Sequence, residues 1–310
     1  MLQARDRDNA LSVTGIPRKL DDARRLRKPA DMANDVKTKP KRSETPRSET
    51  AETFRFLLKL AVVVLILRSF IFAPFSIPSE SMLPRLLIGD YLFVSKWNYG
   101  YSRWSLPAGV PLIPGRILGS TPTRGDVVVF RAPEVLDHDV IKRVIGLPGE
   151  TVQMRQGVVY LNGKPIPKLR IADFTIPLTA NFDAEKCGAP FVDVVANVQI
   201  CRYPRFRETL PGESGAAGRS YEVLDQAELP DRDDTGLYTI PAGHIFVMGD
   251  NRDDSGDSRF PAPGGMGYVP LENVEGKAVV NFFSTDGNAE WLKPWTWVSA
   301  ARWSRIGEGF

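Results

Sequence analysis

Histidine and cysteine are both scarce in this sequence, which holds two of each among 310 residues. His138 and His244 lie far apart, and together with Cys187 and Cys201 they do not form the clustered spacing of a zinc site. We therefore expect no metal and no cofactor, and a metal-dependent protease is disfavoured. With so few histidines, none of them in a suggestive motif, histidine is also not the first choice for a catalytic base.

A large excess of charge of one sign is missing as well. The formal net charge is +3 at pH 7, which is too small to suggest nucleic acid as a partner. The charge is unevenly distributed, because residues 1–50 contain thirteen Lys or Arg against eight Asp or Glu and few aromatic residues. Such a segment buries too little apolar surface to offset its ordering entropy. We predict a disordered basic tail at 1–53, with a short amphipathic helix within Leu20–Arg27 as the alternative.

The sequence has one long hydrophobic run, centred near Val63. Leu60–Leu67 is uninterrupted, and the charged residues Lys59 and Arg68 flank it, where their long side chains can reach opposite membrane interfaces. About 20 residues suit one crossing of a bilayer core of roughly 30 Å. We predict a transmembrane helix at 54–75, with a buried core helix as the alternative. Because the basic excess precedes it, we expect the N-terminus in the cytoplasm and 76–310 on the outer side.

Beyond this run the sequence has short β-branched or aromatic stretches bounded by Gly, Pro or Asp, a pattern typical of strands. They are Tyr91–Val94, Asp126–Phe130, Val140–Ile145, Gly157–Leu161, Phe191–Ile200, Gly243–Met248 and Lys277–Phe283. Asn162-Gly163 predicts a tight type I′ hairpin after the fourth of them. The predicted fold class is mostly β, an antiparallel sheet domain preceded by a single transmembrane helix, with residues 165–237 forming a smaller inserted β subdomain.

Both cysteines fall in the part of the chain expected outside the cytoplasm, where disulfides persist. A bridge between Cys187 and Cys201 would close a loop of about 15 residues, worth roughly 3 kcal/mol in the chain-entropy model. Two free, buried cysteines are the alternative, and the sequence leaves both open.

Two serines and one lysine stand in motifs that permit nucleophilic catalysis. Ser79 and Ser81 occur in Ile77-Pro-Ser-Glu-Ser-Met82, just after the hydrophobic run, and Lys142 lies in an apolar stretch about sixty residues on. A serine hydroxyl is a poor nucleophile until a base takes its proton. Lysine serves as that base when burial favours its neutral amine. This arrangement predicts a membrane-anchored serine protease, whereas an ordinary surface lysine is the alternative for Lys142 by itself.

Five ordered motifs resemble those of the bacterial type I signal peptidases, or leader peptidases. After P-S-x-S-M-x-P they are L-x-x-G-D-x-x-x-V at Leu86–Val94, R-G-D-V-V-V-F at Arg124–Phe130, I-K-R-V-I-G-L-P-G at Ile141–Gly149, and G-D-N-R-D-x-S-x-D-S-R at Gly249–Arg259. The resemblance extends from about Phe54 to the C-terminus, apart from a middle stretch that does not align by eye.

This resemblance implies a role for individual residues. Ser81 is expected to be the nucleophile and Lys142 the general base, while the Ser79 hydroxyl and the Ser81 N–H form the oxyanion hole. A hydrogen bond from Ser255 should orient the lysine, and the charged residues Asp257 and Arg259 should hold their loop. The substrate pocket is expected to have the walls Phe75, Ile77, Met82, Leu86, Asp139 and Ile141. Glu80 departs from the family, which has glycine or another small residue there, and we expect its carboxylate to point into solvent.

The resemblance further implies secretory preproteins as substrates, cut after a small residue with another small residue two positions earlier. The expected location is the bacterial inner (cytoplasmic) membrane, crossed once, with the catalytic domain on the periplasmic or outer side. Trp291, Trp295, Trp297 and Trp303 may be read as a contact with the lipid bilayer or as ordinary core residues. Alternatives are a related Ser/Lys protease, either a self-cleaving repressor or one dedicated to conjugation pilin, and a non-catalytic membrane-tethered assembly factor.

Overall fold

The computed structural model of the protein describes residues 49–133, 138–213, 218–261, 263–290 and 292–310. The chain divides into two compact units, 1–49 and 50–310. The predicted basic tail at 1–53, with its alternative helix at 20–27, lies almost wholly outside the described residues, as does Trp291. The second unit contains all of the motifs named above and is described here by itself.

The hydrophobic run forms a helix that gives way to a strand. Helix α1 (Glu49–Ile66) has no buried residue, and a π-helical turn (Leu67–Ile71) leads into strand β1 (Phe72–Ser76). The predicted helix at 54–75 therefore starts too late and ends too late. Its last residues extend because β1 pairs with a neighbouring strand, and Pro74 is tolerated there because β1 is an edge strand. Among the described residues, no helix combines the length and the apolar character needed to cross a membrane.

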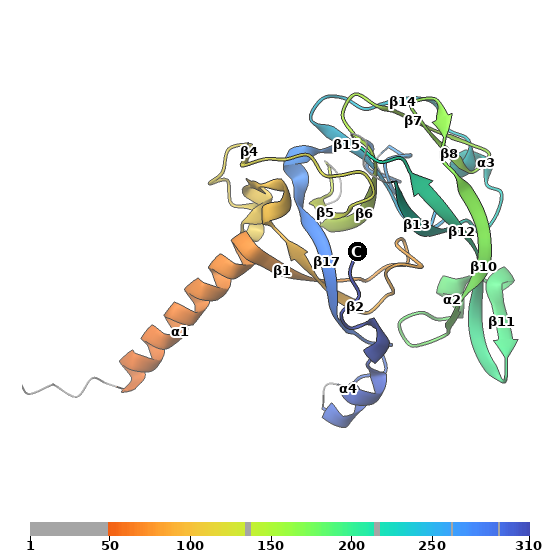
Figure 1. The fold of residues 1–310 in the computed structure, drawn as a ribbon. Coiled ribbons are helices and arrows are strands. Elements are labelled where there is room, and N and C mark those ends of the chain that lie inside the picture. The colour runs from red at the N-terminus through yellow and green to blue at the C-terminus, as the bar shows by residue number, and fades with distance from the viewer. Residues whose placement is uncertain (1–48, 134–137, 214–217, 262, 291) are drawn as a thin grey trace, which may run out of the picture. The chain divides into compact units, whose positions relative to one another are not determined.

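The main element of the fold is a seven-stranded antiparallel sheet, which Figure 1 shows as a curled half-barrel. Its strands, in spatial order after β1, are β2 (Asp90–Ser95), β17 (Val274–Ser284), β5 (Val127–Arg131), β6 (Asp139–Gly146), β15 (His244–Met248) and β16 (Val269–Pro270). Five of the predicted strands are confirmed here within a few residues, because their apolar residues are buried in the sheet. The late strand β17 lies between the early strands β2 and β5.

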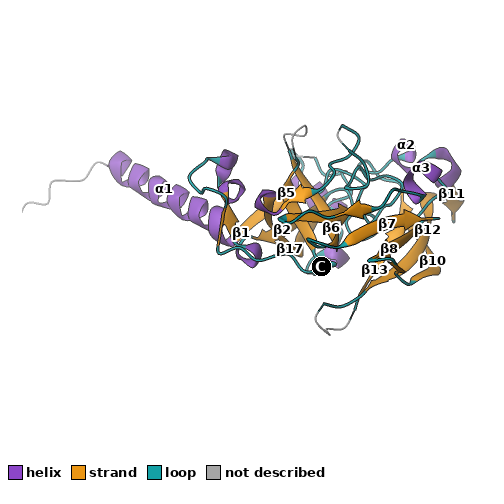
Figure 2. Ribbon diagram, turned by 90° about the horizontal axis from the view of Figure 1, so that it is seen from above, coloured by secondary structure: helices purple, strands orange, loops and turns teal. Residues whose placement is uncertain are grey.

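Three smaller sheets complete the fold, and the strands dominate the view in Figure 2. One contains β10 (Lys168–Pro177), β12 (Val198–Leu210), β11 (Val192–Val195) and β13 (Arg219–Leu224). The others contain β14 (Tyr238–Thr239), β7 (Thr151–Arg155), β8 (Val158–Leu161) and β9 (Lys164–Pro165), and β3 (Tyr101–Ser102) with β4 (Arg116–Ile117). The remaining α-helices are α2 (Ala184–Cys187), α3 (Pro230–Asp233) and α4 (Pro294–Ala300). The prediction of a mostly β, antiparallel fold is confirmed.

Two hairpins test the turn predictions. Asn162 and Gly163 join β8 to β9 with φ values of 51° and 75°, as the predicted type I′ turn requires. The single strand predicted at 191–200 is wrong, because Ala196 and Asn197 also adopt positive φ, 50° and 64°, and fold it into β11 and β12. In the sequence, the valines on both sides of this turn look like one continuous strand, which is why the turn was not predicted.

The middle stretch contains the disulfide. Cys187 and Cys201 are bridged, and both are at least 98% buried, so the alternative of free cysteines is wrong. They belong to a hydrophobic core with Leu83, which follows the serine motif, and with Leu224 of β13. The sheet of β10–β13 is therefore packed against the segment that contains Ser81. Whether 165–237 is an inserted subdomain stays a prediction.

A second hydrophobic core holds the serine motif in place. Ile77, Met82 and Leu86 are buried together with Leu92 and Val94 of β2. Each such side chain contributes about 1.5–3 kcal/mol when it is removed from water. These buried side chains hold the segment between β1 and β2 in place. Because Ser81 lies in that segment, its position is fixed as well.

Candidate active site

Ser81 and Lys142 are brought into direct contact by the fold. The Lys142 side chain projects from β6, and its Nζ donates a hydrogen bond of 2.6 Å to Ser81 Oγ. Ser81 is 7% exposed and Lys142 4% exposed, so the contact is largely shielded from water. The two residues that the sequence singled out as nucleophile and base therefore form one buried pair.

The surroundings of Lys142 act on its charge. Burial favours the neutral amine and lowers the pKa of Lys142 from 10.5 to about 8. The carboxylates of Asp257 and Asp250, and more weakly that of Glu80, oppose this by favouring the ammonium, while Arg259 acts with burial. A pKa near 8 leaves an appreciable fraction of the amine neutral at physiological pH.

Ser79 and Glu80 precede the nucleophile in the same turn. Ser79 is exposed, and its Oγ lies 3.5 Å from Ser81 Oγ. Glu80 is half-buried, and its carboxylate acts to raise the pKa of Lys142, so the expectation that it points into solvent stays a prediction. The backbone of Glu80 is held in place, because its carbonyl accepts hydrogen bonds from Leu83 N and Asn251 Nδ2.

The Gly249–Arg259 loop binds the backbone of the nucleophile. Asn251 N donates a 3.1 Å hydrogen bond to the Ser81 carbonyl. A Cβ on Gly249 would lie 2.3 Å from Ser255 Oγ and 2.5 Å from the Ser81 carbonyl oxygen. Only glycine fits between these two residues, so the glycine of this motif allows the loop to approach the serine closely.

Asp257 and Arg259 form a buried ion pair at the centre of this loop. Their side chains are 2.9 Å apart and fully buried. Burial would raise the pKa of Asp257, but the Arg259 guanidinium outweighs it and holds that pKa below its usual value. Asp257 also accepts a hydrogen bond from Gly249 N, and Arg259 donates one to the Arg252 carbonyl. The expected pair is present, and its contacts join the two ends of the loop.

Ser255 does not make the expected hydrogen bond. It is 1% exposed, and its Oγ has no hydrogen-bond partner within the described part of the chain. Lys142 Nζ instead donates to Ser81. The prediction that Ser255 hydrogen-bonds Lys142 is therefore wrong for this structure, although the side chain does lie beside Gly249 in the site.

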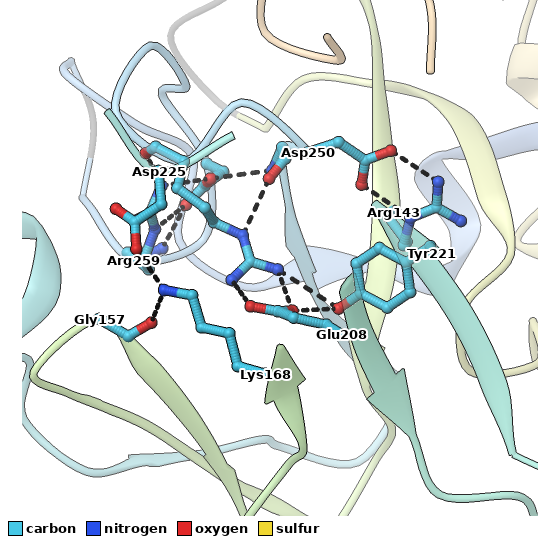
Figure 3. A network of polar contacts seen from close by, with 11 residues as sticks. Arg143, Gly157, Lys168, Glu208, Tyr221, Asp225, Asp250 and Arg259 are labelled. Carbon is cyan, nitrogen blue, oxygen red and sulfur yellow. Dashed lines mark hydrogen bonds and ion pairs between the residues drawn. The ribbon is translucent and has the colours of Figure 1, made fainter. Parts of the chain in front are cut away.

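A second buried network adjoins the loop (Figure 3). Arg143, next to Lys142, makes two hydrogen bonds of 2.7 and 2.6 Å with the Asp250 carboxylate. Its guanidinium lies 4.5 Å from the centre of the Tyr221 ring. Glu208, which is fully buried, accepts hydrogen bonds from Tyr221 and Arg252. Glu208 and Tyr221 were not predicted from the sequence, because they lie in the middle stretch, which contains none of the five motifs.

An open groove runs beside the Ser81–Lys142 pair. This cavity of about 340 Å³ is lined by residues of the β1 end and the β6 start, and four of the predicted wall residues are among them: Phe75, Ile77, Asp139 and Ile141. The other two, Met82 and Leu86, are fully buried and belong to the core behind Ile77, so assigning them to the wall is wrong. His138 and Met266 also line the groove and were not predicted from the sequence.

Away from the groove, one group of acidic residues has ligand-like spacing. Oxygens of Asp225, Asp233 and Asp253 lie within 4.8 Å of one another. Lys168 already pairs with Asp225. Acidic groups of this kind are common without an ion, and we assign no metal to them.

A serine hydroxyl in contact with a buried lysine, beside a groove with two strand edges, is the arrangement of a serine hydrolase. Residues 50–283 match the family model described as signal peptidase, peptidase S26, and the chain belongs to this family. A signal peptidase I of Rickettsia typhi is 35% identical over 284 residues. The aligned region covers 86% of this chain and 94% of the Rickettsia typhi protein. That of Rickettsia akari is 34% identical, covering 79% and 87%.

A solved structure of a signal peptidase I from Enterococcus faecalis V583 is 28% identical and covers 51% of this chain and 97% of its own. Its TM-score of 0.26 is too low to support any argument about the fold.

Proposed function

We propose that this protein removes signal peptides from exported preproteins as a serine endopeptidase, with Ser81 as nucleophile and Lys142 as general base. The observation that carries the proposal is the 2.6 Å contact between Lys142 Nζ and Ser81 Oγ in a buried site. The motif resemblance and the family membership support the substrate class.

In the proposed mechanism, neutral Lys142 accepts the Ser81 proton while Ser81 Oγ attacks the scissile carbonyl carbon. The negative charge on the carbonyl oxygen is stabilised by the Ser79 hydroxyl and the Ser81 N–H, and such donors contribute about 2.7–4 kcal/mol each in serine proteases. The Lys142 ammonium then donates its proton to the leaving amine, so that the signal peptide remains as an ester on Ser81. Water, deprotonated by Lys142, hydrolyses this ester and restores the enzyme.

The substrate chain is proposed to lie in the groove in extended form. β1 is an edge strand, and β15 pairs with β6 only from Arg143 onward, so Asp139–Lys142 keeps one strand edge unpaired among the described strands. Main-chain hydrogen bonds to such edges provide affinity. The shallow walls formed by Phe75, Ile77 and Ile141 would admit only small side chains at the first and third positions before the cut.

We further propose that residues 54–71, the helical part of the predicted span, anchor the protein in the bacterial inner membrane, with the N-terminus in the cytoplasm and the catalytic unit on the outer side. Support comes from the apolar side chains of α1. Leu57, Val63 and Leu65, for example, are each more than half exposed, and no residue of α1 is buried. Exposed Trp295, at 68%, and Trp303, at 60%, offer a second contact with the bilayer.

Purified full-length Ser81→Ala and Lys142→Ala variants should fail to cleave a preprotein while keeping the circular dichroism spectrum of the parent. The matched control is Lys277→Ala, which removes a partly exposed lysine of the same sheet that pairs with Asp126 and lies outside the groove. More than a few per cent of residual activity in either active-site variant would contradict the assignment. Protease protection of inverted and right-side-out vesicles tests the orientation, and cleavage of the catalytic unit from the cytoplasmic side would overturn it.

A further inference from the structure

A second, smaller cavity adjoins the groove on the side away from Ser81. It measures about 110 Å³ and shares two lining residues, Phe75 and Asp139, with the groove. Its lining includes four further charged residues, Arg68, Lys96, Arg131 and Glu275, whereas the groove walls are mainly apolar. A chain bound in the groove and continuing along β1 toward Ala73 would therefore pass this cavity next.

A buried ion pair forms one wall of the cavity. Lys96 Nζ lies 2.7 Å from Glu275 Oε2, and the two side chains are 3% and 8% exposed. Lys96 also lies over the Phe75 ring, 5.6 Å from its centre. Asp139 faces Glu275 from β6 and pairs with Arg131 of β5 at 3.1 Å. Charged groups from β5, β6 and β17, and from Lys96 just after β2, thus converge at the end of the substrate groove.

The cations in this cavity outnumber the carboxylates. Its lining includes Arg68, Lys96 and Arg131 against Asp139 and Glu275. Trp104 is a further lining residue, and the guanidinium of Arg103 stacks on its outer ring, 4.2 Å from the centre. Burial, and then the neighbouring Asp139, raise the pKa of Glu275 to about 7 against the opposing effect of Lys96. Near and below neutral pH, Glu275 is increasingly uncharged, and the positive excess grows.

The position of the cavity corresponds to a definite substrate residue. Asp139 is three residues from Lys142 along β6, which is about 10 Å at the usual rise of a strand. In an extended substrate, alternate side chains face the same way, so the first, third and fifth residues before the cut point toward the enzyme. The first and third occupy the groove, and the fifth, four residues or about 13 Å from the first, lies just beyond Asp139, where the second cavity is.

We propose that this cavity, the charged subsite (Arg68, Lys96, Arg131, Asp139 and Glu275), receives the side chain of the fifth residue before the cut and selects against a positive charge there. The inference rests on the proposed function and extends it to a substrate feature beyond the two small residues. A neutral polar or acidic side chain meets an excess of cations, whereas a lysine would have to be desolvated beside them.

The test uses full-length enzyme in detergent and three preproteins with Asp, Ser or Lys at the fifth position before the cut. We expect kcat/KM for Asp to exceed that for Lys by about tenfold at pH 6, the effect of one unscreened charge at the edge of a protein. The ratio should fall at pH 8, where Glu275 is ionised. Because both substrates are measured on one enzyme at one pH, titration of Lys142 cancels from the ratio.

Two variants separate the subsite from other causes. Glu275→Gln should keep a high Asp-to-Lys ratio that no longer changes with pH, and Arg131→Gln, at a partly exposed residue, should lower the ratio at both pH values. The same three residues placed at the second position before the cut, which faces away, should be cleaved alike. Equal cleavage of all three at the fifth position, or a pH trend that survives in Glu275→Gln, overturns the inference. Failure to cleave any preprotein would instead refute the proposed function.

Discussion

Replacing Glu80 by glutamine should make this enzyme more active at neutral pH. As the proposed base, Lys142 can accept a proton only when neutral, and its pKa of about 8 means that activity should rise with pH and reach half its maximum near pH 8. At pH 7 only about one Lys142 side chain in eleven is then neutral. Because the Glu80 carboxylate favours the ammonium, removing it lowers the pKa of Lys142 and increases the neutral fraction.

The increase in kcat/KM at pH 7 has an upper limit. If every Lys142 became neutral, kcat/KM at pH 7 would increase about elevenfold. Glu80 is the weakest of the influences on Lys142 and is only half-buried, so we expect about a twofold gain, smaller at high salt where a partly exposed charge is screened. Glutamine keeps the shape of the side chain, and the Glu80 carbonyl keeps its hydrogen bonds.

The assay is a pH profile of kcat/KM between pH 6 and 10 for the parent, Glu80→Gln and Glu80→Asp, which retains the charge. Glu222→Gln is the matched control, because this carboxylate lies outside the groove and pairs with Arg205 instead. The half-maximal pH of Glu80→Gln should lie below that of the parent, and the two controls should match the parent. A profile that stays in place or moves to higher pH would refute the electrostatic account of Lys142.

Three further predictions follow from the site and its supports. Ser79→Ala should lower kcat by roughly 10²–10³ with little change in KM, because an oxyanion donor acts on the transition state, and an effect confined to KM would make Ser79 a binding residue. Gly249→Ala should reduce both activity and the melting temperature, since its Cβ would lie 2.3 Å from Ser255 Oγ, and unchanged values would disprove this close packing. Replacing Cys187 and Cys201 together by serine should cost about 3 kcal/mol of unfolding free energy, measured by urea denaturation, and a loss below 1 kcal/mol would contradict the loop-closure argument.

From the sequence it was possible to predict which motifs contact each other, but not which individual hydrogen bonds their side chains make. Ser81 and Lys142 could be paired in advance because each stands in a distinctive motif and because a serine needs a base. Ser255 was expected to hydrogen-bond the lysine, but its Oγ packs beside Gly249 without a partner. Which of several neighbouring hydroxyls receives a bond depends on side-chain rotation, and a motif does not encode this.

It was also hard to predict which apolar residues line the groove and which are buried behind it. Met82 and Leu86 were assigned to the pocket wall together with Ile77, but only Ile77 lines the groove, and the other two anchor the turn from the core. All three are apolar and close in sequence, so their order from surface to core is set by packing against β2. The predicted strand at 191–200 failed for a related reason, because Asn197 was the one weak sign of a turn between two runs of valine.

The strand order of the main sheet has a consequence for the newly made chain. β17, formed by Val274–Ser284, lies between β2 and β5, so the part of the sheet near Ser81 is joined to the part that contains Lys142 only through a strand from the last tenth or so of the chain. During synthesis the nucleophile is made early and its base soon after, yet neither has a sheet to hold it against the other until Ser284 is available. The protein therefore has a built-in delay, because a chain whose synthesis has not yet reached β17 lacks the strand that joins the two halves of the sheet.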